Sequence, residues 1–207
     1  MAIDWDKAVE NPVKKIRFAR EDNGRVRFLS PDEETRLLAH CSHPLRPVII
    51  TALNTGLRRS ELLALSRDDV DFERGLVTVR AAYAKNGKSR SVPMNTMLTH
   101  TLEAVKIKSA GAVFCKQDGK PYRDFRTAFE GAVKRADIPD FTFHDLRHTF
   151  ASPLVMKGVD LPTVKELMGH KHINMTLRYT HLANSHKKDA VSTLESYGTE
   201  SHQFSQQ

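Results

Sequence analysis

The chain has 207 residues, 40% of them hydrophobic and 28% charged, which is the balance of an ordinary globular protein with one main domain. No apolar run approaches the roughly 20 residues that a membrane-spanning helix needs, and the N-terminus lacks the basic-then-apolar order of a signal peptide, so we expect a cytoplasmic protein. The formal net charge of +7 favours a polyanionic partner, although a positive charge also helps to keep a protein soluble.

Residues 1–27 look like a lead-in to the main domain. A short helix is expected before Asn11-Pro12, and a basic stretch without a clear hydrophobic period follows it. The stretch over 14–27 contains six cations and two acids. We therefore expect contacts with a nucleic-acid backbone from Lys14, Lys15 and Arg17.

The chain becomes domain-like at Phe28. Ser30 can cap a first helix that starts at Pro31, and Glu33 completes a capping box. A second helix is predicted to end at Gly56, and a third begins within the sequence LRRSELLAL.

Strand signals follow these helices. A turn at 73–75 leads into LVTVRAAY, which alternates and is rich in β-branched residues, and SRSVPM follows the turn dipeptide Asn86-Gly87. The pattern predicts a tight hairpin in a small antiparallel sheet of about three strands. Cations at the hairpin tip are further candidates for phosphate contacts: Lys85, Lys88 and Arg90.

Helices are expected over most of the remaining chain. The stretches with helical patterns are 95–108, 123–136, 145–158, 162–169, 174–183 and 186–198, followed by a polar tail. Pro153 falls inside one of them, where it removes a backbone donor and should kink or shorten the helix. The predicted fold class is α+β, mainly α-helical with a small antiparallel sheet.

Two short patterns place an arginine beside a potential partner. Arg58 and Glu61 are three residues apart and share a helix face, so the carboxylate can hold a guanidinium that grips a phosphate. The sequence HDLRH repeats this arrangement with His144 and Arg147. Taken alone, each pattern is more common in an ordinary surface or core pair than in a functional site.

The sequence GHKHINMTLRYTH places three histidines around Tyr179. Zinc fits poorly, because His170 and His172 do not share a helix face and no acidic residue between Gly169 and His181 completes a ligand set. Instead, His170 at the end of one helix and Tyr179 on the next can point into a common pocket. A phenol with a pKa of about 10 needs nearby cations or a base before it can act as a nucleophile.

The candidate site is cationic and contains one nucleophile. Its members are Arg58, Lys85, His144, Arg147, His170 and Tyr179. Arginines and a histidine can neutralise the non-bridging oxygens of a phosphodiester as charge builds in the transition state, a task for which other phosphoryl-transfer enzymes use magnesium. A lysine at a hairpin tip can donate a proton to the departing 5′ oxygen. These residues favour phosphoryl transfer on DNA without a metal or another cofactor.

The sequence closely resembles the tyrosine recombinase family, also called phage-type integrases. The matching segments are TGLRRSELLAL, AKNGKSRSVPM, HDLRHTFAS and LMGHKHINMTLRYTHL, in the family's order and at its usual separations. The resemblance implies the family's catalytic-domain fold, with Arg58, Lys85, His144, Arg147 and His170 as catalytic residues, Glu61 as the support of Arg58, and Tyr179 as the nucleophile. It assigns no catalytic role to His148, His172 or His181, which are left to packing or to the phosphate side of the site.

The resemblance also implies a mechanism and an assembly. Tyr179 would attack the scissile phosphate and form a 3′-phosphotyrosyl bond, and four protomers would exchange strands on two double-stranded DNA sites in the nucleoid. Residues 1–27 would be the end of a missing core-binding domain with a basic linker, 28–184 the catalytic domain, and 185–207 a C-terminal helix and tail. The expected DNA contacts are Lys14, Lys15, Arg17, Lys88, Arg90 and Lys171.

Three other interpretations fit part of the sequence. A type IB topoisomerase-like enzyme would use the same chemistry to relax DNA, but the full LMGH…Y pattern favours a recombinase. A DNA-binding module with a silent site is disfavoured because every candidate catalytic position is filled. A zinc hydrolase built on the histidines is disfavoured by their spacing.

Overall fold

The computed structural model describes residues 26–84, 87–105, 111–116, 118–183, 191–192 and 194. The helices are α1 (Pro31–His40), α2 (Leu45–Thr55), α3 (Arg59–Ala64), α4 (Thr96–Ala104), α5 (Arg126–Arg135), α6 (Asp145–Met156), α7 (Leu161–Met168) and α8 (Asn174–Leu177), with 3-10 helices η2 (Arg67–Asp69) and η3 (Thr180–Ala183). Strands β1 (Val70–Asp71), β2 (Leu76–Val79) and β3 (Arg90–Pro93) form one sheet. The expected fold class, mainly helical with a three-stranded antiparallel sheet, is confirmed. No helix in the described ranges is long and apolar enough to cross a membrane.

Helix α1 begins with the capping box that the sequence predicts. The hydroxyl of Ser30 accepts a hydrogen bond from the backbone N–H of Glu33 at 3.2 Å, and the Glu33 carboxylate accepts one from the backbone N–H of Ser30 at 2.9 Å. Two backbone donors at the helix start are thereby satisfied. Arg27 adds an ion pair to Glu33 and fixes the chain where it enters the domain.

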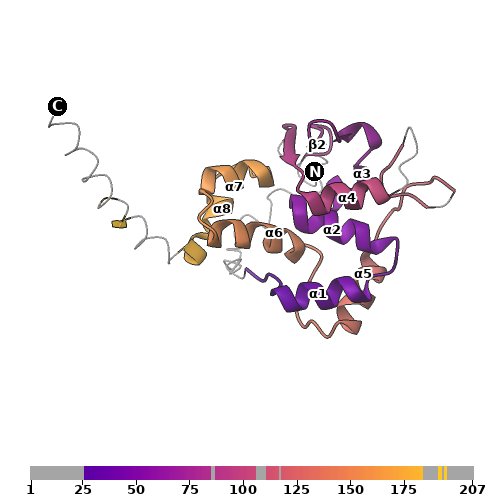
Figure 1. Ribbon diagram of the computed structural model, residues 1–207, viewed down its shortest axis with the longest axis horizontal. Coiled ribbons are helices and arrows are strands. Elements are labelled where there is room, and N and C mark those ends of the chain that lie inside the picture. Colours follow the sequence, from indigo (N-terminus) through magenta and orange to yellow (C-terminus); the bar gives the residue numbers. More distant parts are fainter. Residues whose placement is uncertain are drawn as a thin grey trace, which may run out of the picture.

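Helix α2 lies at the centre of the fold, where it packs against α4 and α6 (Figure 1). Its residues are buried on nearly every side, as expected for a helix inside a core. The helix ends at Gly56, as predicted, with a φ of 61°. A Cβ on Gly56 would lie 2.4 Å from Cδ1 of Phe150, so glycine lets α2 and α6 approach each other here.

The sheet has the order β1-β2-β3 and is antiparallel throughout. Pairing between β2 and β3 ends at Val79 and Arg90, so the connection between the two strands is longer than the tight hairpin that the sequence predicts. The backbone N–H of Gly87 donates to the carbonyl of Ala84 at 2.9 Å. Strand β2 ends at Val79 because a backbone turn starts at Arg80. The side chain of Arg80 donates to the side chains of Asp69 and Ser66. Asn86 itself lies outside the described residues.

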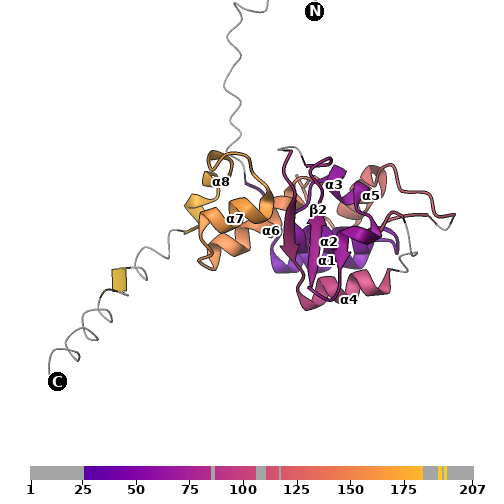
Figure 2. The same cartoon turned by 90° about the horizontal axis from the view of Figure 1, so that it is seen from above.

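The buried apolar side chains form two clusters that share α6. The larger cluster contains side chains from helices α1, α2, α3, α4 and α5 and from the sheet. It also includes Leu146 in the first turn of α6. The smaller one contains Ala151 and Val155 of α6, side chains of α7, and Tyr179. Figure 2 shows α7 beside the sheet, in agreement with contacts between α7 and β3. The start of α6 therefore lies where the two clusters meet.

Pro153 does not shorten α6. The helix continues beyond the proline to Met156, so this part of the prediction is wrong. Pro153 is exposed and stands in the last turn of the helix, where the loss of one backbone donor is tolerated.

The stretch over 174–183 is not the single helix that the sequence predicts. It divides into the short helix α8 and the 3-10 helix η3, and Tyr179 occupies the turn between them. The backbone N–H of Tyr179 donates to the carbonyl of Thr176 at 3.0 Å, and that of Leu182 donates to the carbonyl of Tyr179 at 2.9 Å. These tight turns point the apolar ring of Tyr179 into the smaller cluster, and its burial there explains why helical periodicity failed. Most of the predicted helix 186–198 lies outside the described residues.

Candidate active site

Arg58 and Glu61 form the contact that their spacing predicts. Arg58 is the N-cap of α3, and its Nη1 donates to Oε1 of Glu61 at 2.9 Å while its backbone N–H donates to Oε2 at 2.8 Å. The Glu61 side chain is fully buried, whereas 17% of the Arg58 side chain remains exposed. Burial alone would raise the pKa of Glu61, but the hydrogen bond and charge of Arg90, with those of Arg58, lower it below its usual value.

Arg90, an expected DNA contact, does not lie at a hairpin tip. It opens β3, and its Nη2 donates to Oε2 of Glu61 at 2.7 Å. Its Nε donates to the carbonyl of Leu167 at 3.0 Å. Because only 6% of the side chain is exposed, this guanidinium is committed to the protein interior.

Arg147 is the other buried arginine of the site. Its Nη1 donates to the carbonyl of Gly56 and its Nη2 to the carbonyl of Met168, which are groups at the ends of α2 and α7. Burial lowers the pKa of Arg147 to about 9, with smaller contributions from the charges of Arg58 and Arg90. The guanidinium therefore remains charged at neutral pH and ties two helix ends to α6.

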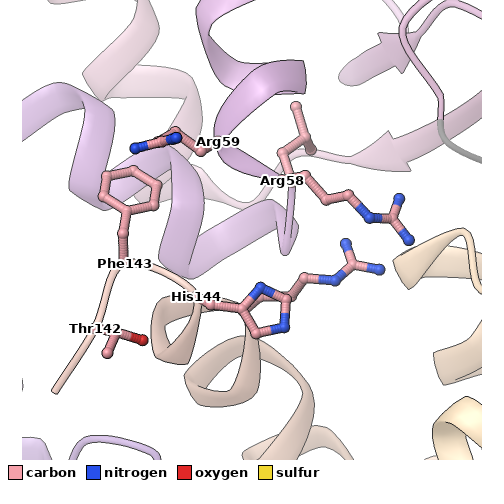
Figure 3. A pocket seen from close by; sticks show the side chains of 7 residues that line it. Arg58, Arg59, Thr142, Phe143 and His144 are labelled. Atoms are coloured by element: carbon pink, nitrogen blue, oxygen red, sulfur yellow. The ribbon is translucent and has the colours of Figure 1, made fainter. Parts of the chain in front are cut away.

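An open pocket of about 300 Å³ brings three of the predicted residues together, namely Arg58, His144 and Arg147. The side chains of Arg58 and His144 extend toward the same side of this pocket from the starts of α3 and α6 (Figure 3). Burial lowers the pKa of His144, and the charge of Arg147 lowers it further. The pocket thus gathers fixed positive charge and an imidazole on one exposed surface, which suits an anionic ligand.

His170 follows the C-cap of α7 and is buried. It follows Gly169, whose φ is 61° and whose added Cβ would lie 2.8 Å from Nη1 of Arg90. Nδ1 of His170 lies 2.9 Å from the hydroxyl of Thr176, and the ring is 8% exposed. Burial, together with the charge of Arg147, lowers the pKa of His170 to about 3, so the ring is neutral at pH 7.

Tyr179 is close to the site but is not open to it. Its side chain is 1% exposed, and its hydroxyl lies 2.7 Å from Nδ1 of His148. Burial raises the pKa of Tyr179 to about 12, against the charges of Arg147 and Arg178. Burial also lowers the pKa of His148 to about 4. Both groups are therefore neutral at pH 7, and the phenol is buried against a neutral imidazole.

Comparisons with known proteins identify the family of this chain. Residues 27–186 match the Phage integrase family. The chain belongs to this family. Its relatives include the integrase of Salmonella phage P22, with 34% identity over 95% of this chain and 54% of the relative, and that of Haemophilus phage HP1, with 33% identity over 88% of this chain and 51% of the relative. The chain therefore spans about half the length of these curated relatives.

Solved structures of integrases have the same fold. The catalytic domain of bacteriophage HP1 integrase is 32% identical, with a TM-score of 0.63, over 81% of this chain and 95% of that domain. A Tn1549 transposon integrase solved in complex with circular intermediate DNA is 26% identical, with a TM-score of 0.69, over 86% of this chain and 69% of that one.

Two residues beside the predicted site have contacts or charges that the sequence did not predict. His148, which was left to packing or to the phosphate side, contacts the Tyr179 hydroxyl, and its ring also lies edge-on to that of His144 with the centroids 5.2 Å apart. The four-residue spacing of the two histidines on one helix face was the available signal. Arg178 was not considered, although its charge acts on Tyr179 and on all three histidines of the site.

The remaining predicted residues lie on the surface or beyond the described ranges. Lys88 and Lys171 are exposed. Lys85, Lys14, Lys15 and Arg17 lie outside the described residues. Within the part of the chain that the structure describes, no group of three or more histidine, cysteine, aspartate or glutamate side chains is arranged to hold a metal ion.

Proposed function

We propose that this chain is the catalytic domain of a site-specific DNA recombinase that cuts and rejoins strands through a 3′-phosphotyrosyl intermediate. The observation that carries the proposal is the convergence of Arg58, His144 and Arg147 on one open pocket, with a tyrosine stored beside it, in a member of the Phage integrase family. A pocket of this charge fits one phosphodiester of a DNA backbone.

In the proposed reaction the two arginines bind the scissile phosphate. Arg58 is the more exposed of the two, and the Arg147 guanidinium is fixed by two carbonyl groups. Their positive charges offset the negative charge that builds on the non-bridging oxygens in the transition state, which is the largest catalytic effect available here. His144 at the pocket adds a hydrogen bond to the same phosphate.

Tyr179 supplies the nucleophile. The bond from its Oη to phosphorus forms as the bond from phosphorus to the 5′ oxygen breaks. The phenolic proton passes to a ring nitrogen of His144, which lines the pocket and whose lowered pKa keeps the imidazole available as a base. The departing 5′ oxygen takes up a proton, which we assign to Lys85, and rejoining follows the same path in reverse. Energy of the phosphodiester is kept in the intermediate, so the reaction needs no nucleotide cofactor.

The burial of Tyr179 requires a rearrangement before attack. A side chain that is 1% exposed cannot reach phosphorus, so the hydroxyl must leave His148 when DNA binds. Tyr179 lies in a turn between two short helices, a place where a few backbone torsions are sufficient to move a side chain.

The proposed partner is double-stranded DNA, and the full-length protein would act as a tetramer on two sites in the cytoplasm. The Tn1549 transposon integrase, which shares this fold, was solved with DNA. The net charge of +7 is consistent with such a partner. Residues 28–184 form the catalytic unit in this proposal. The DNA backbone is contacted by Lys14, Lys15 and Arg17, which precede this unit, and by Lys88 and Lys171.

The test is a covalent-trapping assay on a pool of nicked duplexes with randomised cores, in which the nick lets the cleaved strand dissociate. We expect a protein–DNA adduct that survives denaturation and forms equally well in EDTA. Tyr179→Phe removes one oxygen atom and should abolish the adduct while DNA binding, measured by fluorescence anisotropy, is retained. An adduct with Tyr179→Phe, or none with the wild-type chain at low salt, contradicts the proposal.

A further inference from the structure

The carboxylate of Glu61 is shared between two arginines. Its Oε1 accepts from Nη1 of Arg58 at 2.9 Å and from Nη1 of Arg90 at 3.1 Å. Its Oε2 accepts from the backbone N–H of Arg58 at 2.8 Å and from Nη2 of Arg90 at 2.7 Å. Arg90 therefore makes the two-pronged contact of a guanidinium with a carboxylate, the arrangement with the best-defined geometry.

The two arginines differ in access. Arg58 lines the open pocket, whereas the Arg90 side chain is 6% exposed and lies on the inner side of Glu61. Arg90 therefore cannot take the phosphate itself. Its effect on a ligand in the pocket has to pass through Glu61.

The charges of the three groups give Arg90 a defined task. A pair of Arg58 and Glu61 alone would be neutral, and the carboxylate would compete with a phosphate for the guanidinium. With Arg90 added, the group carries one net positive charge, and two of the carboxylate's hydrogen bonds are taken up by a residue that cannot move toward the ligand. Arg58 then keeps its charge for the phosphate while Glu61 still fixes its direction.

Arg90 is itself held in place by α7. Its Nε donates to the carbonyl of Leu167 at 3.0 Å, and its guanidinium fills the space where Gly169 has no Cβ. The carbonyl of Met168, between these two residues, accepts from Arg147. One short segment at the end of α7 thus anchors both buried arginines of the site.

We infer that Arg90 is a positioning residue for strand cleavage, which acts through Glu61 to orient Arg58 and to leave its charge available to the scissile phosphate. The inference rests on the proposed function. It gives Arg90 a role inside the site in place of the expected contact with DNA. It also predicts that lysine cannot replace Arg90, because one ammonium group cannot contact both oxygens of Glu61 and the Leu167 carbonyl at once.

The experiment compares Arg90→Lys with Arg80→Lys in the trapping assay. Arg80 is a matched control because it also pairs with a buried carboxylate, that of Asp69, but at the other end of the 80–89 connection. We expect Arg90→Lys to slow single-turnover adduct formation about 30-fold, since a small misplacement of a catalytic group can cost up to ~100-fold, with DNA affinity unchanged. Arg80→Lys should cleave at the wild-type rate.

A double-mutant cycle shows whether the effect passes through Arg58. In the Arg58→Ala background, Arg90→Lys should cause less than about a threefold further loss, because the group that it orients is already absent. A second variant, Glu61→Gln with Arg90→Met, removes both buried charges together and should fold while still cleaving slowly. Thermal melting of each variant reports folding.

The outcomes separate the two proposals. If the wild-type chain forms the adduct and Arg90→Lys matches it, or if the losses from Arg58→Ala and Arg90→Lys multiply in full, the role of Arg90 is overturned and the recombinase function stands. If the wild-type chain forms no adduct, the proposed function fails and the role of Arg90 fails with it.

Discussion

The two halves of the site differ in charge and in access. Around Arg58 and Glu61 the groups are ionised, hydrogen-bonded and arranged beside an open pocket. Around Tyr179 and His148 the groups are neutral, and the phenol is closed off from solvent. The arginine half, which would bind a phosphate, is already arranged for binding without a ligand. The tyrosine half, which would attack the phosphate, is buried and inaccessible.

This difference indicates where the free energy of DNA binding is needed. Preorganised charge stabilises a transition state without reorganisation at the moment of reaction, so the arginine half benefits from being rigid. A nucleophile that is buried until DNA binds cannot react with the wrong phosphate. In the proposed reaction, part of the free energy of DNA binding would be used to release Tyr179 from the smaller apolar cluster.

The largest expected effect separates the two arginines of the rigid half. Arg58→Ala and Arg147→Ala should each slow adduct formation about 100- to 1,000-fold, because each removes one donor to the developing charge. Their effects on folding should differ. Arg147→Ala leaves the buried carbonyls of Gly56 and Met168 without a donor and should lower the free energy of unfolding by about 3 kcal/mol. Arg58→Ala leaves Glu61 paired with Arg90 and should cost less than about 1 kcal/mol.

Urea denaturation of both variants, followed by circular dichroism, measures this difference. Arg147→Lys serves as the control that keeps the charge but not the two-carbonyl contact. Equal losses of stability for Arg58→Ala and Arg147→Ala would contradict the view that Arg147 is also a structural tie between α2 and α7.

The second prediction concerns pH and the stored half. The pKa of His148 is about 4 and that of His170 about 3 in the folded chain, against about 6.5 in an unfolded one. The unfolded state therefore binds protons first, so stability is complete above pH 6.5 and is lost as the pH falls toward 4. Protonation of each ring on unfolding lowers the free energy of unfolding by on the order of 3 kcal/mol at pH 4.

Melting temperatures between pH 7.5 and 4 measure this loss. His170→Asn and His148→Phe should each flatten the profile, because each removes one ring that has to be protonated on unfolding. Glu61, whose pKa is lowered from 4.5, adds its own loss only below that pH, so the loss between pH 6.5 and 4.5 comes from the histidines. A profile that His148→Phe leaves unchanged would show that this ring is not held neutral by the fold.

Much of the fold and of the rigid half could be predicted from local sequence signals. The capping box at Ser30, the end of α2 at Gly56 and the Arg58–Glu61 contact each depend on residues within a few positions of one another. The role of Arg90 could not be predicted, because its partners Glu61 and Leu167 are 29 and 77 residues away. The buried turn at Tyr179 was also missed, since tertiary packing overrides helical periodicity there.

The smallest expected effect tests the contact that sequence reasoning did not find. The hydrogen bond between Tyr179 and His148 joins two neutral buried groups, so its coupling energy should be about 1 kcal/mol. The double-mutant cycle of Tyr179→Phe and His148→Phe measures this energy by urea denaturation. Each single change leaves a buried polar group without its partner, and the double change removes both groups, so the double variant should be more stable than the sum of the single losses predicts. A coupling energy near zero would mean that packing in the smaller cluster alone holds the phenol in its stored position, and the neutral half of the site would then differ from the charged half in burial but not in hydrogen bonding.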